Sequence, residues 1–150
     1  MNSIYRTNSF EISVPVGDLF PLFSPEGEKL WVPGWDYQNV MGTTELSEDY
    51  VFLTTTHDHN AKRAIWIVKS FDPDLYSVQF YRVEPEEKVG VVSVVCTELE
   101  SAKTRVQVTY KYTALSAAGE KFIAEFSAER YAAFIDEWRV LLLAHFQSGD

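Results

Sequence analysis

Hydrophobic and polar residues alternate along much of the chain with a period of two, which is typical of half-buried β-strands. The pattern is clear near the amino terminus, where Phe10, Ile12 and Val14 alternate with polar residues, and again over residues 103–113. Between these segments, β-branched and aromatic stretches are separated by short polar turns, such as residues 72–74. Because short turns join antiparallel neighbours, the pattern predicts an antiparallel meander.

Two short helices are expected after the first strand. Residues 18–23 form an apolar run long enough for one helical turn. Ser24 then offers a side-chain cap, Pro25 suits the first helical position, and acidic residues occupy the first turn. Proline and glycine at 33–34 end this second helix early. The later strands are expected over residues 50–56, 63–71, 75–83, 88–99 and 103–113.

The carboxyl-terminal segment changes to a helical period, which predicts one amphipathic helix over residues 118–147. At a rise of about 1.5 Å per residue, such a helix is about 45 Å long and can cross a whole sheet. Its apolar side collects Ile123, Ala124, Tyr131, Phe134, Trp138, Leu141, Leu142 and His145.

This order of elements predicts a single α+β domain over residues 1–150, in which a curved antiparallel sheet of about seven strands surrounds a long carboxyl-terminal helix. An antiparallel sheet commonly has one solvated and one covered face, and the long helix is the element available to cover it. A straight helix on a twisted sheet leaves space beside it. The pattern therefore predicts a cavity between sheet and helix.

The segment at residues 19–35, LFPLFSPEGEKLWVPGW, together with the order of elements, resembles the START-like or SRPBCC helix-grip superfamily. The likeness is to its small bacterial proteins related to polyketide cyclases and lipid-transfer domains, and the strand ending at residues 66–73 is similar to that group too. The resemblance implies a helix-grip fold whose pocket binds hydrophobic molecules, with Trp31 and Trp35 sealing one end. It supplies no catalytic motif, and the fold alone does not select one function.

Composition and charge narrow the range of partners. Acidic residues outnumber basic ones by 22 to 13, and the net charge of −9 repels nucleic acid and anionic lipid surfaces. No run approaches the roughly 20 apolar residues of a membrane span, and the first residues lack the pattern of a signal peptide. The one cysteine, Cys96, leaves no internal disulfide, so a cytoplasmic protein is expected. A homodimer is left open.

Aromatic residues make up 15% of the chain, which fits either a bulky core or a cavity with aromatic walls. The expected pocket residues are Trp35, Phe52, Trp66, Phe80, Arg82, Tyr110, Tyr112, Tyr131, Phe134 and Trp138. Arg82 either reaches the pocket, where it binds a carboxylate or carbonyl, or lies at an exposed strand end. The tyrosine hydroxyls bond either a ligand or a backbone carbonyl.

The histidines have competing explanations. His57 and His59 are spaced so that both face one way in an extended segment and bind a metal, but turn chemistry explains them more simply and no third ligand is evident. His145 either acts on a ligand or complements the dipole at the carboxyl end of the long helix.

Three other polar or reactive side chains are candidates for the pocket or for the protein surface. Arg130 and Glu137 lie at the edge of the helix's apolar side, where a pocket role competes with solvation. Cys96 shares a strand face with two glutamates, which places it on the outer face without a nucleophilic role.

The leading hypothesis is a binding module, a carrier or sensor of a small hydrophobic or amphipathic ligand. The alternatives are a polyketide cyclase or dehydratase, using Arg82 and a tyrosine or histidine, and a protein-interaction domain like the co-chaperone members of the superfamily. No catalytic residue, metal or cofactor is assigned.

Overall fold

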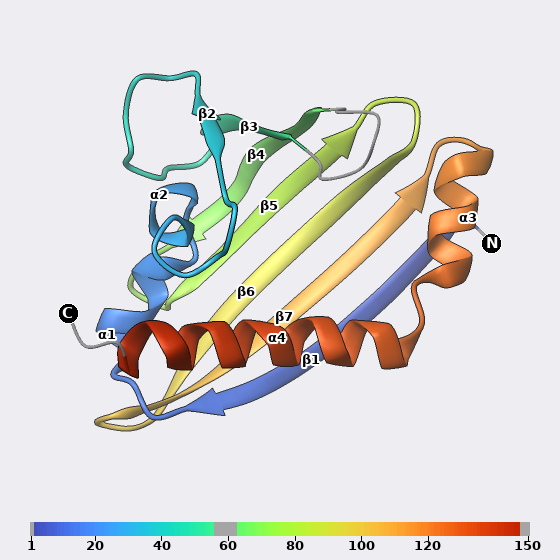
Figure 1. Cartoon of the computed structure of the whole chain (residues 1–150). Helices are drawn as coiled ribbons and strands as arrows, with labels where there is room; N and C mark the ends of the chain where they lie inside the picture. Colours follow the sequence, from blue (N-terminus) through green and yellow to red (C-terminus); the bar gives the residue numbers. More distant parts are fainter. Residues whose placement is uncertain (1, 56–62, 148–150) are drawn as a thin grey trace.

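The computed structural model describes residues 2–55 and 63–147, which form a seven-stranded antiparallel sheet with helices on its concave side (Figure 1). The strands are β1 (Ser3–Ile12), β2 (Tyr37–Asn39), β3 (Val51–Thr55), β4 (Arg63–Asp72), β5 (Ser77–Glu84), β6 (Lys88–Glu100) and β7 (Lys103–Ala114). The helices are α1 (Val16–Leu19), the 3-10 turn η1 (Phe20–Leu22), α2 (Pro25–Glu28), α3 (Ala117–Glu125) and α4 (Ala128–Gln147). The predicted α+β helix-grip fold is confirmed.

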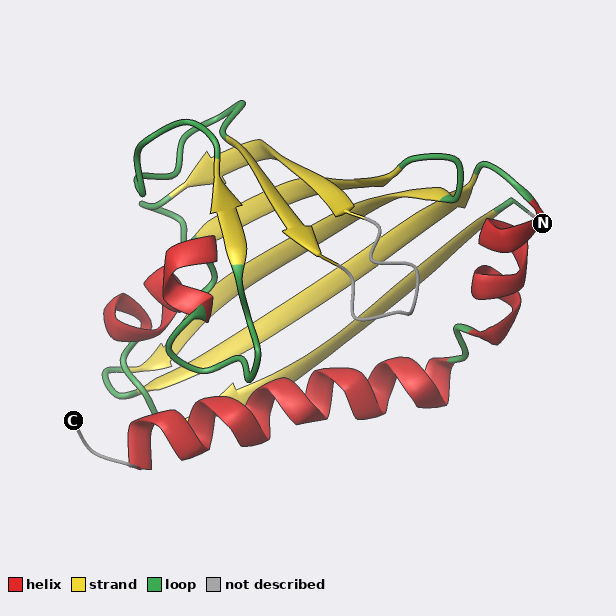
Figure 2. Cartoon of the chain, turned by 45° about the horizontal axis from the view of Figure 1, so that its top comes forward, coloured by secondary structure: helices red, strands yellow, loops and turns green. Residues whose placement is uncertain are grey.

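The sheet has the order β1-β7-β6-β5-β4-β3-β2, so consecutive strands are neighbours except where β1 joins β7. Ser3 lies opposite Thr113 and Ile12 opposite Thr104 in this pair. The buried hydroxyl of Thr104 also donates a hydrogen bond to the carbonyl of Val14 (2.8 Å), which holds the chain as it turns from β1 toward α1. Figure 2 shows α4 running beside the β1 edge, with β2 and β3 at the opposite edge of the curved sheet.

Two local predictions are also confirmed. The side chain of Ser24 caps α2 by accepting a hydrogen bond from the amide of Gly27 (2.9 Å). On β7, the four residues of the predicted inward face are buried: Val106, Val108, Tyr110 and Tyr112. Strand β7 therefore presents two aromatic rings to the concave side.

The carboxyl-terminal helix differs from the prediction, because it is two helices rather than one. Phe126, between α3 and α4, leaves the helical conformation (φ −87°, ψ 68°), and its carbonyl accepts a hydrogen bond from Arg6 Nε of β1 (3.1 Å). Ser127 then caps α4, its Oγ accepting from the amide of Arg130 (3.1 Å). The break comes from a tertiary contact and a serine cap, so the continuous apolar period concealed it. With 20 residues, α4 is about 30 Å long.

The predicted outer position of Cys96 is wrong. Cys96 is buried (3% exposed), in line with Val92 and Val94 on the inward face of β6. Glu98 and Glu100 continue toward the exposed end of the strand, where the pairing with β7 also shifts register. The hydrophobic core therefore ends between Cys96 and Glu98. Alternation of residues along the strand does not show where on one face the buried part ends.

We expect the thiol of Cys96 to be unreactive in the folded protein. Burial raises its pKa to about 12, so the reactive thiolate is scarce near neutral pH. A chromogenic disulfide reagent should label less than about a tenth of the native thiol in the time that it labels all of the denatured thiol. Equal labelling rates in the two states would contradict the burial of this side chain.

Candidate functional site

Two adjoining cavities lie between the concave face of the sheet and α4, with volumes of about 410 Å³ and about 320 Å³. Both are bordered by Arg82, Tyr110 and Phe134, so these side chains stand where the two cavities meet. The larger, here called the tryptophan cavity, is bordered by all four tryptophans of the chain: Trp31, Trp35, Trp66 and Trp138. The smaller, here called the arginine cavity, lies toward α3 and the start of α4 and is also bordered by Tyr112, Phe122 and Arg130.

The tryptophans near α2 have their polar atoms satisfied by backbone. Trp31 Nε1 donates to the carbonyl of Leu22 (2.9 Å), and Trp35 Nε1 donates to the carbonyl of Pro25 (2.8 Å). Trp138 of α4 packs edge-to-face on Trp31, with ring centroids 5.6 Å apart. The contact between Trp31 and Trp138 thus packs the segment after α2 against α4 beside the cavity.

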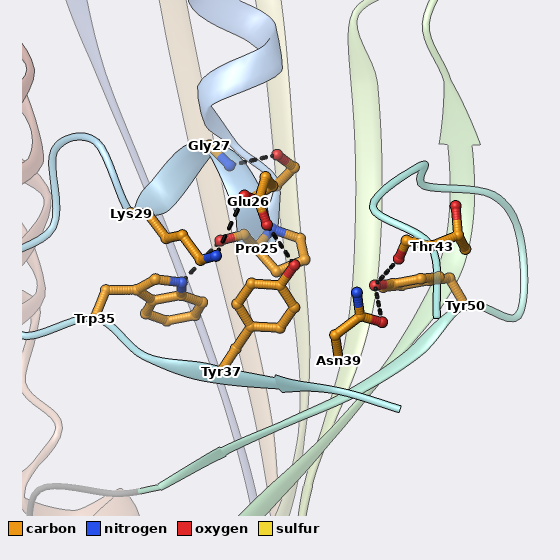
Figure 3. Close-up of polar contacts among 10 residues, drawn as sticks. Pro25, Glu26, Gly27, Lys29, Trp35, Tyr37, Asn39, Thr43 and Tyr50 are labelled. Carbon is orange, nitrogen blue, oxygen red and sulfur yellow. Dashed lines mark hydrogen bonds and ion pairs between the residues drawn. The ribbon is translucent and has the colours of Figure 1, made fainter. Parts of the chain in front are cut away.

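A hydrogen-bond network joins α2 to β2 and to the segment between them (Figure 3). The hydroxyl of Tyr37 donates to Glu26 Oε2 (2.6 Å), and Glu26 also pairs with Lys29 (3.2 Å). Tyr37 first, and then Lys29, hold the pKa of Glu26 below its ordinary value. In the loop that follows β2, the carbonyl of Thr43 accepts a hydrogen bond from the hydroxyl of Tyr50 (2.7 Å). The segment that carries Trp35 is therefore fixed by several contacts.

Arg82 lies on the inward face of β5, so the alternative of an exposed strand end is wrong. Its guanidinium lies 5.3 Å from the ring centroid of Trp66, its partner on β4, and Nη1 donates to the hydroxyl of Tyr112 (3.1 Å). Gly90, which pairs with both Arg82 and Tyr112, makes this contact possible, since a Cβ at Gly90 would lie 2.7 Å from the tyrosine ring. The buried Nε of Arg82 has no hydrogen-bond acceptor among the described residues.

Behind Arg82 lies a buried cluster of charges. The ammonium of Lys88, a residue 2% exposed, contacts Glu84 (2.9 Å) and Glu87, and Arg82 Nη1 lies 3.7 Å from Glu84. Lys88 Nζ also lies 3.8 Å from the ring centroid of Phe122 in α3. Two cations and two carboxylates balance in this cluster, so the charge of Arg82 is compensated without a ligand.

Carboxyl groups of the tryptophan cavity have no such compensation. Glu28 from α2, Asp36 from the segment before β2 and Glu137 from α4 all border it. Asp36 and Glu137 are exposed, whereas Glu28 is half-buried, and burial raises the pKa of Glu28 to about 8. Among the described residues, the Glu28 carboxyl has no hydrogen-bond donor and no cation as partner. In the sequence, Glu28 is one of the acidic residues expected in the first turn of a helix, so the residue pattern does not reveal its place at the cavity.

Tyr110 places a hydroxyl group, which has no hydrogen-bond partner among the described residues, where the two cavities meet. Its ring is buried, and burial raises its pKa well above the ordinary value, so the hydroxyl stays protonated. No described residue hydrogen-bonds it, which leaves it free to donate to or accept from a bound molecule.

The predicted pocket residues divide into two groups. Those that border the cavities are Trp35, Trp66, Arg82, Tyr110, Tyr112, Phe134 and Trp138. Phe52 and Phe80 instead lie in the core, packed on Trp66 with ring centroids 5.5 Å and 5.8 Å away. The hydroxyl of Tyr131 donates to the carbonyl of Val108, which is the backbone alternative for a tyrosine hydroxyl.

The remaining candidates are placed as follows. Arg130 borders the arginine cavity, where its Nη1 donates to the carbonyl of Glu125 (3.0 Å). His145 lies in the last turn of α4, with its ring 5.0 Å from that of Phe146, and borders neither cavity. His57 and His59 fall outside the described residues.

Two absences hold for residues 2–55 and 63–147. No cluster of three or more histidine, cysteine, aspartate or glutamate side chains has the arrangement to hold a metal ion. No helix in these ranges combines the length and the apolar character needed to span a membrane.

The sequence matches no protein-family model and no curated protein. Solved structures do match. Norcoclaurine synthase from Thalictrum flavum, in complex with dopamine and hydroxybenzaldehyde, has a TM-score of 0.67 at 12% identity over 95% of this chain and 88% of that chain. Major latex-like protein 151 from Panax ginseng reaches 0.72 at 18% identity over 97% and 98%. Ara h 8.0201 reaches 0.65 at 12% over 95% and 94%. At such identities the likeness establishes the helix-grip fold alone.

Proposed function

We propose that this protein binds a small hydrophobic or amphipathic molecule in the tryptophan and arginine cavities, as a carrier or sensor. The observation that carries the proposal is the tryptophan cavity, whose volume of about 410 Å³ is bordered by four indole rings. Ligand pockets are commonly about 300–1,000 Å³, with mostly apolar walls and a few polar groups. Entry of an apolar ligand releases the water held against these rings, which favours binding.

Arg82 and Tyr110 supply polar groups that can orient a ligand where the cavities meet. The guanidinium is held by Trp66 and Tyr112, and the Tyr110 hydroxyl has no partner among the described residues. A carbonyl or hydroxyl group on the ligand can bond both. The complex of norcoclaurine synthase with dopamine and hydroxybenzaldehyde adds support by analogy, since both are small aromatic molecules and that protein has the same fold.

A cyclase or dehydratase is the second candidate, favoured by the hydrogen bond between Arg82 Nη1 and the Tyr112 hydroxyl (3.1 Å). A cation that polarises a carbonyl group beside a phenol suits such chemistry in a largely apolar cavity. Ring closure of a linear polyketide thioester by the protein, and its loss in Arg82→Gln, would support this candidate over simple binding.

The first test of binding is native mass spectrometry of protein purified from its own host, followed by denaturing extraction. A stoichiometric small molecule supports the proposal. An empty protein that also shows no change in melting temperature with any of a panel of lipids and aromatic compounds would count against it.

Phe134→Ala should weaken binding of an apolar fluorescent probe by about tenfold, because this ring borders both cavities and its loss removes contact area worth roughly 1–2 kcal/mol. The ring is 39% exposed, so the substitution should cost little stability. Val140→Ala is the matched control, since Val140 is 50% exposed on the same helix and borders neither cavity. Equal probe affinity in the two variants would place the probe elsewhere.

A further inference from the structure

We infer that the ligand of the tryptophan cavity carries a protonated nitrogen, which binds beside Glu28 while its apolar or aromatic body lies against the indole rings. This inference rests on the proposed function and specifies the class of ligand, an amphipathic organic cation. Three features of the cavity support it.

The first feature is charge balance. Arg82, the only cation bordering the tryptophan cavity within the described residues, is already paired with the cluster of Glu84, Glu87 and Lys88. The carboxyl groups of Glu28, Asp36 and Glu137 border the same cavity, and no ion pair is formed by any of the three within the described chain. A cationic ligand would therefore supply the missing counter-charge.

The second feature is the position of Glu28. Its side chain is half-buried at the border of the cavity and has neither a donor nor a cation as partner among the described residues, which disfavours its charged form. Once it is ionised, a carboxyl in this position lowers the stability of the empty protein. An ammonium group within a few ångströms of the carboxylate reverses the effect, because an opposite charge favours the ionised form.

The third feature is the aromatic wall. Indole has the most favourable ring face for a cation, and Trp31, Trp35 and Trp138 border this cavity beside Trp66, whose ring already contacts the Arg82 guanidinium. A carboxylate beside aromatic faces is an arrangement that binds ammonium groups through both charge pairing and cation–π contact. The net charge of −9 also raises the local concentration of cations around the protein.

Other ligand classes fit less well. An anionic ligand has Arg82 as its only cationic partner among the described residues of this cavity, and it meets three carboxyl groups. A neutral ligand brings no positive charge to favour ionisation of the Glu28 carboxyl, whose raised pKa of about 8 keeps it largely protonated near neutral pH. Both classes become outcomes of the test.

The test compares three probes of matched size: naphthylethylamine, naphthylethanol and naphthylacetate. Their dissociation constants are measured by isothermal titration calorimetry at about pH 6 and about pH 9. We expect the amine to bind at least about tenfold tighter than the alcohol at the higher pH, and the acetate to bind weakest. The amine should gain about tenfold or more as the pH rises, because at the lower pH it must displace the proton of Glu28. The affinity of the alcohol should change little.

Glu28→Gln separates the contribution of Glu28 to amine binding from the contributions of the other charged or titratable groups that border the cavity. These are Asp36, Glu137, Arg82 and Tyr110. The substitution should abolish the pH-dependent gain of the amine and leave the alcohol unchanged. Glu129→Gln is the control, because it removes the same charge from an exposed position of α4 outside both cavities.

Glu28→Gln should also raise the melting temperature of the empty protein at neutral pH. Because the pKa of Glu28 is raised in the folded state, the protein loses stability as the pH rises from the ordinary pKa of a glutamate to about 8. Glutamine does not ionise, so the variant avoids this loss. A variant that is more stable when empty but binds the amine less well is the pattern of a binding residue rather than a structural one.

The outcomes separate this inference from the proposed function. If the alcohol binds as tightly as the amine, or the acetate binds tightest, the inference fails while the cavity remains a binding site. If no probe binds, the proposed function fails and the inference fails with it. Retention of the pH-dependent gain in Glu28→Gln would assign the effect to another group and overturn the role of Glu28.

Discussion

Lys88→Met should destabilise the protein by about 3–5 kcal/mol, which is a large share of the stability of a single domain. The ammonium group of Lys88 contacts Glu84 and Glu87, and the side chain is only 3% exposed. Methionine fills much of the same space but carries no charge. The partly or largely buried carboxylates of Glu84 and Glu87 then have Arg82 as the one remaining cation of the cluster. Removing one member of a buried ion pair costs more than the pair itself contributes, because the remaining charge is left uncompensated. Chemical denaturation with urea measures the loss as a change in the unfolding free energy.

Lys103→Met is the matched control for this substitution. Lys103 also pairs with a glutamate, Glu11, at 3.3 Å, but both side chains are at least 40% exposed. An exposed pair contributes roughly 0–1 kcal/mol, so this variant should remain close to wild type. If the two lysine variants lose similar free energy, the charges behind Arg82 are solvated and do not form a buried cluster.

Leu142→Ala should destabilise the protein by about 2–5 kcal/mol, because Leu142 is fully buried on the side of α4 that packs against the sheet. Truncation removes apolar contacts and leaves a void that the rigid sheet closes only in part. Val140→Ala, at a position 50% exposed on the same helix, should change the unfolding free energy by no more than about 0.5 kcal/mol. Urea denaturation of both variants measures the difference.

Leu141→Ala provides an internal comparison one residue away. Leu141 borders the tryptophan cavity, so its truncation widens an existing space instead of creating a new one. Its loss of stability should therefore be smaller than that of Leu142→Ala, while probe binding should weaken. The opposite ranking of the two leucines would mean that α4 presents another side to the sheet.

The fold could be predicted from the sequence because it depends on local periods and local chemistry. Alternation with a period of two predicts β7 with the correct face inward, and Ser24 caps α2 as its position before Pro25 indicates. A helical period covers α3 and α4 but does not reveal the break at Phe126. That break depends on Arg6 of β1, which only folding brings to the Phe126 carbonyl.

The site could be predicted only in part, since a side chain's surroundings depend on elements far away in the sequence. The same face of β5 carries Phe80 into the core and Arg82 to the cavities, where Gly90 leaves room for the Tyr112 ring that contacts the guanidinium. Alternation identifies the face but not the point along it at which core gives way to cavity. The pattern fails to identify the buried position of Cys96 for the same reason, at the other end of the core.

Charged groups show the limit most clearly. Lys88, Glu84 and Glu28 belong to segments that are polar in sequence, where solvation is the ordinary expectation. By itself the sequence determined most of the elements, the order in which they follow one another, the inward face of β7 and the expectation of a cavity. The tertiary structure alone decided which charges are withdrawn from water and which are paired, because burial and pairing are set by the residues that folding brings together.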